Sequence, residues 1–318
     1  MKAAVLDRYG DQERLEIREV EKPSPGTGQL LVRVHAASVN PIDWKMRRGD
    51  LRFVRPARFP LILGYDVAGE VEAIGPEVSQ FAPGDAVYAF TDNPHGGGYA
   101  EYVLVGESAA APKPARLSFE DAAAVPLAAI TALKALRDKG ELAEGERLLV
   151  NGAAGGVGHF AVQIGKALGA RVVGVASRRN QDFLREIGAD RAIDYGQEDF
   201  EQDDETYDVV FDTVGNSSLR DCDLILGDGG IFVTTGVSPN LILQSAAATV
   251  SSLFGSSRRA RFVMVKPNGQ DLAVIGRLID TGRVRPTIAE VFSLERIREA
   301  HLRSEEGHVR GKVVVRIG

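Results

Sequence analysis

A glycine-rich turn at residues 152–158 constrains the fold of this chain more than any other feature of its sequence. The turn follows an apolar segment at 147–151 and leads into an amphipathic segment at 159–168, which is the pattern of a strand, a tight turn and a helix. Similar segments alternate as far as residue 235, with a further helix expected at 217–226. Because strands that alternate with helices of this length pair in parallel, the sequence predicts an α/β fold with a doubly wound parallel sheet.

The part of the chain before this region follows a different pattern. Short strand-like segments broken by Gly and Pro continue to about residue 105, and an Ala-rich helical segment begins near residue 119. A chain of 318 residues is also long enough for two domains. We therefore expect a β-rich domain at 1–120, a domain with the parallel sheet at 121–260, and a segment at 261–318 that returns to the first domain.

Composition excludes several classes of function. The chain carries 38 basic and 44 acidic residues, and its net charge of -6 has the wrong sign for a surface that binds duplex nucleic acid. No apolar run is long enough to span a bilayer, and the first residues become charged too early for a signal peptide. We expect a soluble, cytoplasmic protein that acts on a small molecule, without a nucleic acid or membrane partner.

Residue types that bind metals tightly are scarce. Cys222 is the single cysteine, so one chain can form neither an internal disulfide nor a thiolate-rich zinc site. The five histidines are scattered, and no two of them have the spacing that places a pair of metal ligands on one helical face. The sequence therefore predicts a protein without a metal ion.

The glycine turn has the features of a dinucleotide site. Gly155 and Gly156 lack a Cβ atom, so the backbone up to Val157 can approach a pyrophosphate, and the N-terminus of the following helix adds partial positive charge. Gly158 allows the helix and the strand to pack closely. Because Ala153 replaces the first glycine of the usual G-x-G-x-x-G pattern, a glycine-rich turn without a ligand is the alternative.

The residues after the second strand of this region indicate which dinucleotide binds. An NAD enzyme places Asp or Glu there, against the 2′-hydroxyl of the ribose. This chain has Ser177 and Arg178 instead. A hydroxyl and a guanidinium can hydrogen-bond a 2′-phosphate, which a carboxylate would repel. The sequence therefore predicts NADPH (NADP) as the cofactor, with solvated arginine side chains as the alternative.

Several ordered motifs resemble one protein family over nearly the whole chain. They lie at residues 38–45, 63–71, 84–87, 98–102, 152–158 and 311–314. Together they are similar to the zinc-independent quinone oxidoreductase and alkenal/enone reductase branch of the medium-chain dehydrogenase/reductase superfamily. The resemblance implies a GroES-like β-rich catalytic domain, a Rossmann domain and a homodimer, for which the apolar segment at 231–233 is a candidate seam.

The resemblance also bears on the metal and on the reaction. In zinc-containing relatives a Cys ligand stands at the position of Asn40, and a Gly-His-Glu element stands where this chain has Gly64, Tyr65 and Asp66. Without a Lewis acid, alcohol oxidation of the zinc type is not expected. A hydride that adds to a quinone or to the β-carbon of an enone leaves negative charge on oxygen, which hydrogen-bond donors can stabilise. The resemblance implies this reaction, with Tyr65 as the candidate catalytic donor.

Further positions are candidate contacts of the cofactor, and Asn40, Lys45, Thr131 and Tyr195 among them resemble family residues. Four of them follow predicted parallel strands, at the edge where open α/β sheets bind ligands: Val214, Gly215, Thr235 and Gly236. The others are Asn40, Lys45, Thr131, Tyr195, Phe262, Val263 and Lys312. Structural alternatives stay open for several positions: a helix cap at Asn40, a packed ring at Tyr65, a backbone hydrogen bond at Thr131, and an ordinary strand-end aromatic at Tyr195.

Two other functions compete with quinone or enone reduction. One is reduction of another activated alkene, such as an enoyl thioester, although the sequence has no clear feature of a groove for coenzyme A. The other is a binding protein that keeps the cofactor fold and contributes little catalysis, because a fold alone does not determine function. Tight binding of NADPH without its oxidation by any acceptor would favour the binding protein.

Overall fold

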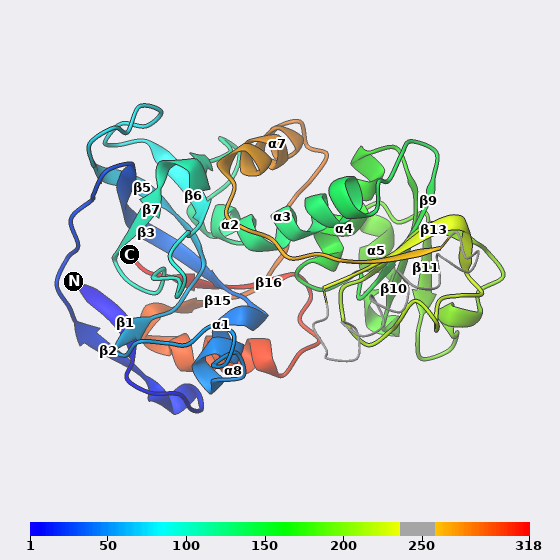
Figure 1. Cartoon of the computed structure of the whole chain (residues 1–318), viewed down its shortest axis with the longest axis horizontal. Helices are drawn as coiled ribbons and strands as arrows, with labels where there is room; N and C mark the ends of the chain where they lie inside the picture. The colour runs from blue at the N-terminus through cyan, green and yellow to red at the C-terminus, as the bar shows by residue number, and fades with distance from the viewer. Residues whose placement is uncertain (236–257) are drawn as a thin grey trace. The chain divides into compact units, whose positions relative to one another are not determined.

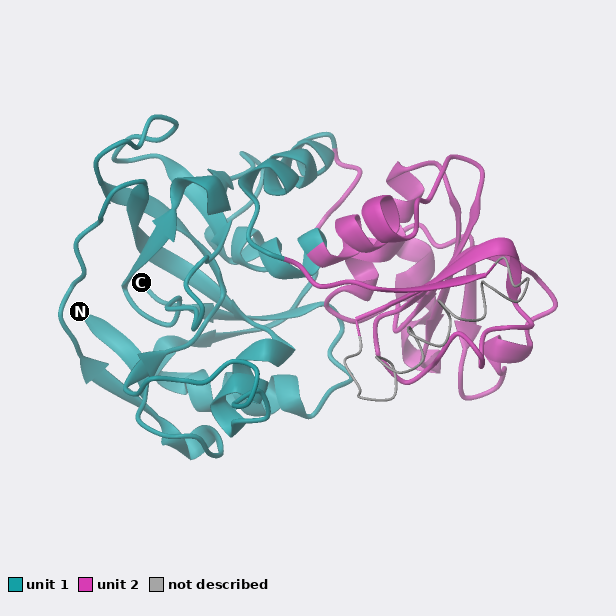
Figure 2. Ribbon diagram, viewed as in Figure 1, with its two compact units in different colours: residues 1–130, 266–281, 286–318 teal, residues 131–265, 282–285 magenta. Residues whose placement is uncertain are grey.

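The computed structural model describes residues 1–235 and 258–318 of the chain. The chain divides into two compact units, which Figure 2 draws in separate colours. Unit 1 contains residues 1–130, 266–281 and 286–318, and unit 2 contains residues 131–265 and 282–285. The chain passes from unit 1 to unit 2 inside helix α3 (Pro126–Lys134). Residues near the C-terminus therefore contribute to both units.

Unit 1 is built mainly of strands (Figure 1). Its larger sheet has seven strands in the order β15-β16-β3-β5-β6-β8, with β7 also paired to β3, and its smaller sheet has the order β2-β1-β4. These strands are β1 (Lys2–Leu6), β2 (Leu15–Glu19), β3 (Gln29–Val39), β4 (Leu61–Ile62), β5 (Asp66–Ile74), β6 (Ala86–Phe90), β7 (Tyr102–Gly106), β8 (Ala110–Pro112), β15 (Ile288–Ser293) and β16 (Lys312–Arg316). The last strand of the chain, β16, pairs antiparallel with β3.

The pairing of β3 with β5 positions the polar residues of unit 1. Ser38 near the end of β3 is paired with Asp66 at the start of β5. At Gly69 the two strands lie so close that a Cβ atom would meet the carbonyl oxygen of Arg33 at 2.0 Å, which requires glycine. The helices of this unit are α1 (Pro41–Arg48), α2 (Phe119–Ala123), α7 (Gly269–Asp280) and α8 (Ile297–Glu305). Because α1 begins directly after β3, Asn40 stands at the junction beside Asp66.

The described residues of unit 2 form a sheet of six parallel strands, which confirms the predicted doubly wound sheet. The strand order is β11-β10-β9-β12-β13-β14. The strands are β9 (Arg147–Asn151), β10 (Arg171–Ala176), β11 (Arg191–Asp194), β12 (Tyr207–Asp212), β13 (Leu226–Thr234) and β14 (Arg259–Phe262), and helices α4 (Gly158–Ala167) and α5 (Gln181–Glu186) connect the first three. The strand order reverses between β9 and β12, and sheets of this kind bind ligands at the carboxyl ends of the strands flanking such a point.

The helix expected at 217–226 is not present. The segment forms hydrogen-bonded turns at 219–225, and strand β13 already begins at Leu226. Ser218 donates its hydroxyl to Asp221 at 2.6 Å, a local side-chain bond that competes with a regular helix. The buried residues Cys222 and Ile225 still pack in the core of unit 2. The spacing of apolar residues therefore predicted their burial correctly, but the prediction of a helix was wrong.

The proposed seam at 231–233 is also contradicted by the structure. These residues lie in β13, which is paired with β12 on one side and with β14 on the other. Ile231, Phe232 and Val233 are all buried within the unit. The sequence pattern identified an apolar strand, but it could not show that a later segment, β14, covers its edge.

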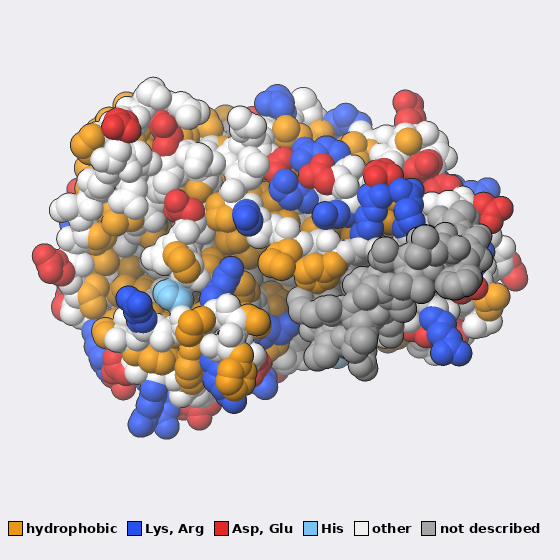
Figure 3. Space-filling model, in the orientation of Figure 1, with side chains coloured by type: hydrophobic (Ala, Val, Ile, Leu, Met, Phe, Trp, Pro, Cys, Tyr) orange, Lys and Arg blue, Asp and Glu red, His pale blue; other side chains and the backbone are white. Residues whose placement is uncertain are grey.

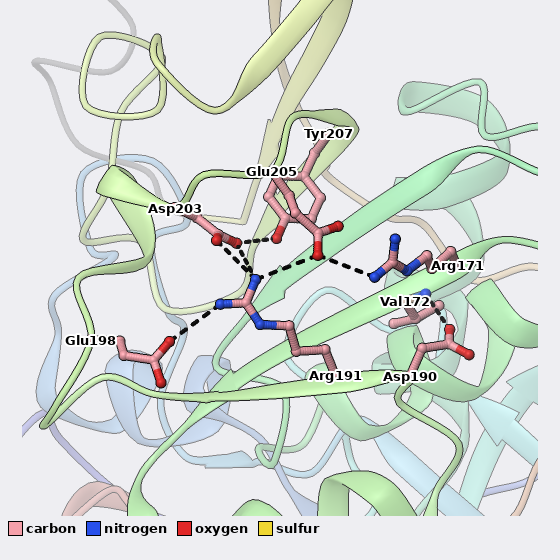
Figure 4. A network of polar contacts seen from close by, with 8 residues as sticks. All are labelled: Arg171, Val172, Asp190, Arg191, Glu198, Asp203, Glu205 and Tyr207. Atoms are coloured by element: carbon pink, nitrogen blue, oxygen red, sulfur yellow. Dashed lines mark hydrogen bonds and ion pairs between the residues drawn. The ribbon is translucent and has the colours of Figure 1, made fainter.

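The acidic segment before β12 is held against the amino ends of the sheet (Figure 4). Arg191, the first residue of β11, and Arg171, the first residue of β10, pair with its carboxylates. Their partners are Glu198, Asp203 and Glu205. The network lies at the edge opposite the carboxyl ends of the strands, and partly exposed ion pairs of this kind contribute up to about 1 kcal/mol each. Its role is therefore to fix the loop.

The surface carries charges of both signs. Lys and Arg side chains are interspersed with Asp and Glu side chains on the face drawn in Figure 3. In the described part of the chain, none of the helices combines the length and the apolar composition that crossing a membrane requires.

Candidate functional site

The glycine turn joins the end of β9 to helix α4 at the switch point of unit 2. A Cβ atom at Gly158 would lie 2.1 Å from the carbonyl oxygen of Gly152, so only glycine lets the helix start this close to the strand end. Residues 155–157 are partly exposed, and among the described residues the amides of Gly156 and Val157 have no hydrogen-bond acceptor. Amides without a protein partner at a helix N-terminus are the groups that bind anions.

Asp212, at the end of β12, organises the loop beside this turn. Its buried carboxylate accepts hydrogen bonds from the amides of Val214 and Gly215, each at 3.0 Å, and from Asn151 Nδ2 at 3.1 Å. The Thr213 hydroxyl donates to the carbonyl oxygen of Asn151 at 2.7 Å. These bonds hold the loop after β12 against the loop after β9, so Val214 and Gly215 flank the glycine turn.

Three more of the predicted cofactor residues lie along the same edge of the sheet. Ser177 and Arg178 follow β10, and Tyr195 follows β11, which pairs with β10. Arg178 is exposed and forms no ion pair with any described residue. Tyr195 is half exposed. The edge thus presents a hydroxyl, an unpaired guanidinium and a phenol, which are suitable donors for a phosphate group.

The other predicted residues of unit 2 have more varied settings. Thr235 follows β13 and donates its hydroxyl to a carbonyl oxygen of the loop after β12 at 3.2 Å. Phe262 ends β14, and the amide of Val263 donates to a carbonyl oxygen of β13 at 3.0 Å. Thr131 lies in helix α3 and is buried. Gly236 lies outside the described residues.

A buried polar cluster in unit 1 forms where three strands begin or end. The Asp66 carboxylate accepts hydrogen bonds from Asn40 Nδ2 at 2.8 Å and from the Ser38 hydroxyl at 2.9 Å. The Lys312 ammonium donates to the side-chain oxygen of Asn40 and lies 3.4 Å from the same Asp66 oxygen. None of these four residues is more than 4% exposed. Burial lowers the pKa of the Lys312 ammonium, and the negative charge of Asp66 opposes that shift.

Asp43, in the first turn of α1, links this cluster to the segment before β5. Its carboxylate accepts hydrogen bonds from the amide of Asn40 at 2.7 Å and from the amide of Gly64 at 3.0 Å. Burial raises the pKa of Asp43 to about 7, while the two amides favour its ionised form. Asn40 is the N-cap residue of α1, and both its backbone and its side chain are fixed by acidic neighbours.

Tyr65 uses a different set of partners. Its hydroxyl donates a hydrogen bond to the carbonyl oxygen of Pro94 at 2.7 Å and accepts one from Arg55 Nη1 at 3.2 Å. Burial raises the pKa of the Tyr65 hydroxyl, so this group stays protonated at neutral pH. The ring is buried and packs edge-on against Phe90, with 6.0 Å between ring centres.

Comparison with known proteins identifies the two parts of the chain. Residues 26–115 match the alcohol dehydrogenase GroES-like domain, and residues 187–315 match a family described as zinc-binding dehydrogenase. The mitochondrial NAD(P)H oxidoreductase RTN4IP1 of Danio rerio is 33% identical, over 100% of this chain and 91% of the relative. The chain belongs to the medium-chain dehydrogenase/reductase superfamily.

Further matches place the chain within this superfamily. The solved structure of the quinone oxidoreductase from Coxiella burnetii superposes with a TM-score of 0.88 and 34% identity, over 100% of this chain and 99% of that one. The 2-methylene-furan-3-one reductase of Solanum lycopersicum is 34% identical, over 99% of this chain and 79% of the relative. The chain is therefore an oxidoreductase of the quinone oxidoreductase-like branch, and the predicted combination of a GroES-like and a Rossmann fold is confirmed.

Most of the predicted site residues of this oxidoreductase lie in two places. In unit 2 they follow the carboxyl ends of neighbouring strands around the glycine turn. In unit 1, Asn40 and Lys312 lie in the buried cluster, where the Lys312 ammonium donates hydrogen bonds to Asn40 and Asp66. Lys45 lies apart from both groups: its side chain is exposed on α1, with Nζ 5.5 Å from the centre of the Trp44 ring.

The structure shows three residues at these sites that the sequence did not predict. Asp66 and Asp43 are buried carboxylates that fix Asn40, and Arg55 contacts the Tyr65 hydroxyl. For Asp66 there was a usable signal, because a carboxylate that opens an apolar strand needs a buried partner. For Arg55 there was none, since it lies in a loop without a regular pattern.

Proposed function

We propose that the chain is an NADPH-dependent reductase that transfers a hydride to a quinone or an α,β-unsaturated carbonyl compound without a zinc ion. The observation that carries the proposal is the carboxyl edge of the parallel sheet in unit 2. There, the Gly156 and Val157 amides, which no described residue accepts, follow β9, and Ser177 and Arg178 follow its neighbour β10. The relatives named as NAD(P)H oxidoreductase, quinone oxidoreductase and furanone reductase support the reaction class.

The residues of unit 2 fit a dinucleotide with an adenosine 2′-phosphate. The amides of Gly156 and Val157 would hold the pyrophosphate at the N-terminus of α4, and Gly155, whose own amide donates to the Gly152 carbonyl oxygen, would let the backbone approach it. Ser177, Arg178 and Tyr195 would bind the 2′-phosphate. The other proposed cofactor contacts are Val214, Gly215, Thr235, Gly236, Phe262, Val263 and Thr131 in unit 2, with Asn40, Lys45 and Lys312 in unit 1. When bound, NADPH supplies the hydride.

Zinc does not fit the residues at the family's metal positions. Asn40 and Tyr65 provide an amide and a phenol in place of the Cys and His ligands that the family resemblance puts there. The Lys312 ammonium already bonds the side-chain oxygen of Asn40 and lies 3.4 Å from Asp66, so a cation occupies these two acceptors. In the parts of the chain that the structure describes, no three His, Cys, Asp or Glu side chains are grouped to hold a metal ion.

The reaction then depends on hydrogen-bond donors at the acceptor oxygen. Hydride addition at the β-carbon and protonation at the α-carbon convert an enone to a saturated carbonyl compound and NADPH to NADP⁺. A quinone takes up the hydride and a proton to become a hydroquinone. In both cases negative charge develops on oxygen. A protonated phenol such as Tyr65, itself bonded by Arg55, can stabilise it when its O–H turns from the Pro94 carbonyl oxygen to the acceptor oxygen.

The cellular setting is also a proposal. We propose a cytoplasmic homodimer. Its domains are proposed at 1–120 and 121–260, with a segment at 261–318 that returns to the first domain. The relative from Danio rerio is mitochondrial, so the location of this chain does not follow from its relatives. With the apolar segment at 231–233 buried inside unit 2, the homodimer requires a different surface as its interface.

The proposed function is tested by following the oxidation of NADPH and NADH with a simple quinone and with a simple enone. We expect turnover with at least one acceptor and a kcat/KM at least about tenfold higher with NADPH, because charge-assisted bonds to the 2′-phosphate are absent with NADH. Tight binding of NADPH without turnover of any acceptor would overturn the catalytic part of the proposal and favour a binding protein.

Replacing Arg178 by alanine is expected to raise the KM for NADPH about 10- to 100-fold, because charged hydrogen bonds to the phosphate contribute about 1.5–3 kcal/mol. The KM for NADH should change little. Arg185→Ala is the matched control, since Arg185 is an exposed arginine in α5 whose partner is Asp182 rather than the sheet edge. Equal changes in KM for the two cofactors would count against a 2′-phosphate site at Arg178.

A further inference from the structure

A partly buried arginine lies against the proposed catalytic tyrosine. Arg55 belongs to the loop between α1 and β4, and its Nη1 atom donates to the Tyr65 hydroxyl at 3.2 Å. Its guanidinium carbon is 5.9 Å from the centre of the Tyr65 ring. Because the Tyr65 hydroxyl donates to the Pro94 carbonyl oxygen, the arginine supplies the hydrogen bond that this hydroxyl accepts. One N–H of the five in the guanidinium is thus engaged, and the others remain for a ligand.

The charge of Arg55 has no acidic partner among the described residues. Neither Arg55 nor Arg58 forms an ion pair with any described residue, and residues 236–257 contain no Asp or Glu. By contrast Arg47, in α1, is fully buried and pairs with Glu305. A fully exposed arginine needs no partner because water solvates it. Arg55 is partly withdrawn from water beside a buried tyrosine, so an anion at this place would gain from its charge.

A histidine adjoins the same place. His95 follows Pro94, and its Nδ1 atom is buried without a hydrogen-bond partner among the described residues. The pKa of His95 is lowered, first by burial and then by the positive charges of Arg55 and Arg58. The two arginines are therefore close enough to act on this ring, and the neutral imidazole can donate one N–H.

We infer that Arg55, together with His95, forms a carboxylate-binding subsite, and that the acceptor of this enzyme is an enone that carries a carboxylate. The inference rests on the proposed function, because it names the acceptor of the same reaction. A guanidinium binds a carboxylate through paired, charge-assisted N–H donors, and a partly buried site strengthens such bonds. During turnover the hydride and one proton add across the carbon–carbon double bond, and the carboxylate is unchanged.

The subsite is tested with 4-oxo-2-pentenoate and its methyl ester, which share the enone and differ in the charge. We expect Arg55→Gln to lower kcat/KM for the acid at least about tenfold more than for the ester, mainly through KM, because the variant lacks the charged donors that bind the carboxylate. Arg55→Lys should recover part of the loss, since it keeps the charge without the paired donors. Arg52→Gln is the control in the same loop, where Arg52 is exposed and lies over the Phe53 ring, and it should change neither value.

Binding of the saturated acid 4-oxopentanoate gives a readout that does not depend on turnover. Calorimetry in the presence of NADP⁺ should show tighter binding of the acid than of its methyl ester to the wild-type enzyme, and loss of that difference in Arg55→Gln. Equal losses for acid and ester, or equal binding of the two saturated compounds, would overturn the subsite. Absence of all NADPH oxidation together with a retained preference for the acid would instead overturn the proposed function and leave the subsite standing.

Discussion

Replacing Asp66 by alanine is expected to lower the free energy of unfolding by about 3–5 kcal/mol, because the change leaves the buried Lys312 ammonium without its counter-charge. The loss of stability is larger because three other donors also lose their acceptor. One carboxylate oxygen of Asp66 accepts hydrogen bonds from Ser38 and Asn40, and the other accepts one from the Leu127 amide at 2.8 Å. Thermal unfolding followed by circular dichroism should show a melting temperature lower by roughly 10 °C.

An exposed ion pair of equal length provides the control for this prediction. Arg48 Nε and Asp50 Oδ2 are 3.4 Å apart, as are Lys312 Nζ and Asp66 Oδ2, but the Asp50 side chain is 41% exposed and the Asp66 side chain 0%. Asp50→Ala should therefore cost at most about 1 kcal/mol. The double change Asp66→Ala with Lys312→Met should recover part of the stability, because it removes both buried charges. Similar melting temperatures for Asp66→Ala and Asp50→Ala would refute the argument.

The features that sequence predicted correctly depend on neighbours along the chain. The apolar strand, the glycine turn and the amphipathic helix lie in one continuous stretch, and the structure places β9, the turn and α4 there. The spacing of apolar residues was sufficient to predict a parallel sheet, because short strands joined by helices have few other ways to bury their faces. The same reasoning failed at 217–226, where apolar residues bury their side chains from turns rather than from a helix.

The candidate site of unit 1 depends on pairing between distant segments, which no local pattern reveals. Lys312 is separated by 272 positions from Asn40 and by 246 from Asp66, and β16 brings these residues together through its pairing with β3. The resemblance to a family marked Asn40 and Lys312 one by one. It could not show that they contact each other, or that Asp66 holds both. Similarly, no local pattern shows that β14 pairs with β13 and covers its edge in unit 2.

Replacing Gly155 and replacing Gly158 by alanine are expected to have different consequences, although both glycines belong to the same turn. A Cβ atom at Gly155 would have one neighbour within 4 Å, the Gly152 carbonyl oxygen at 3.3 Å, so the fold can accept it with a small shift. A Cβ atom at Gly158 would lie 2.1 Å from that oxygen and 2.7 Å from Ala153 Cα, so the backbone must move. Gly158→Ala should therefore reduce both stability and NADPH binding.

Gly155→Ala should keep a melting temperature close to that of the wild type and still weaken NADPH binding by at least about 100-fold. The added methyl group would stand where the pyrophosphate has to approach the amides of Gly156 and Val157, and each charge-assisted bond that is lost costs about 1.5–3 kcal/mol. Fluorescence titration with NADPH, together with thermal unfolding without cofactor, separates the two effects. If Gly155→Ala binds NADPH as tightly as the wild type, the turn is a structural connection between β9 and α4, and the dinucleotide must bind elsewhere. A loss of binding without a loss of stability is a result that a purely structural turn cannot produce, because such a turn acts on the cofactor only through the fold.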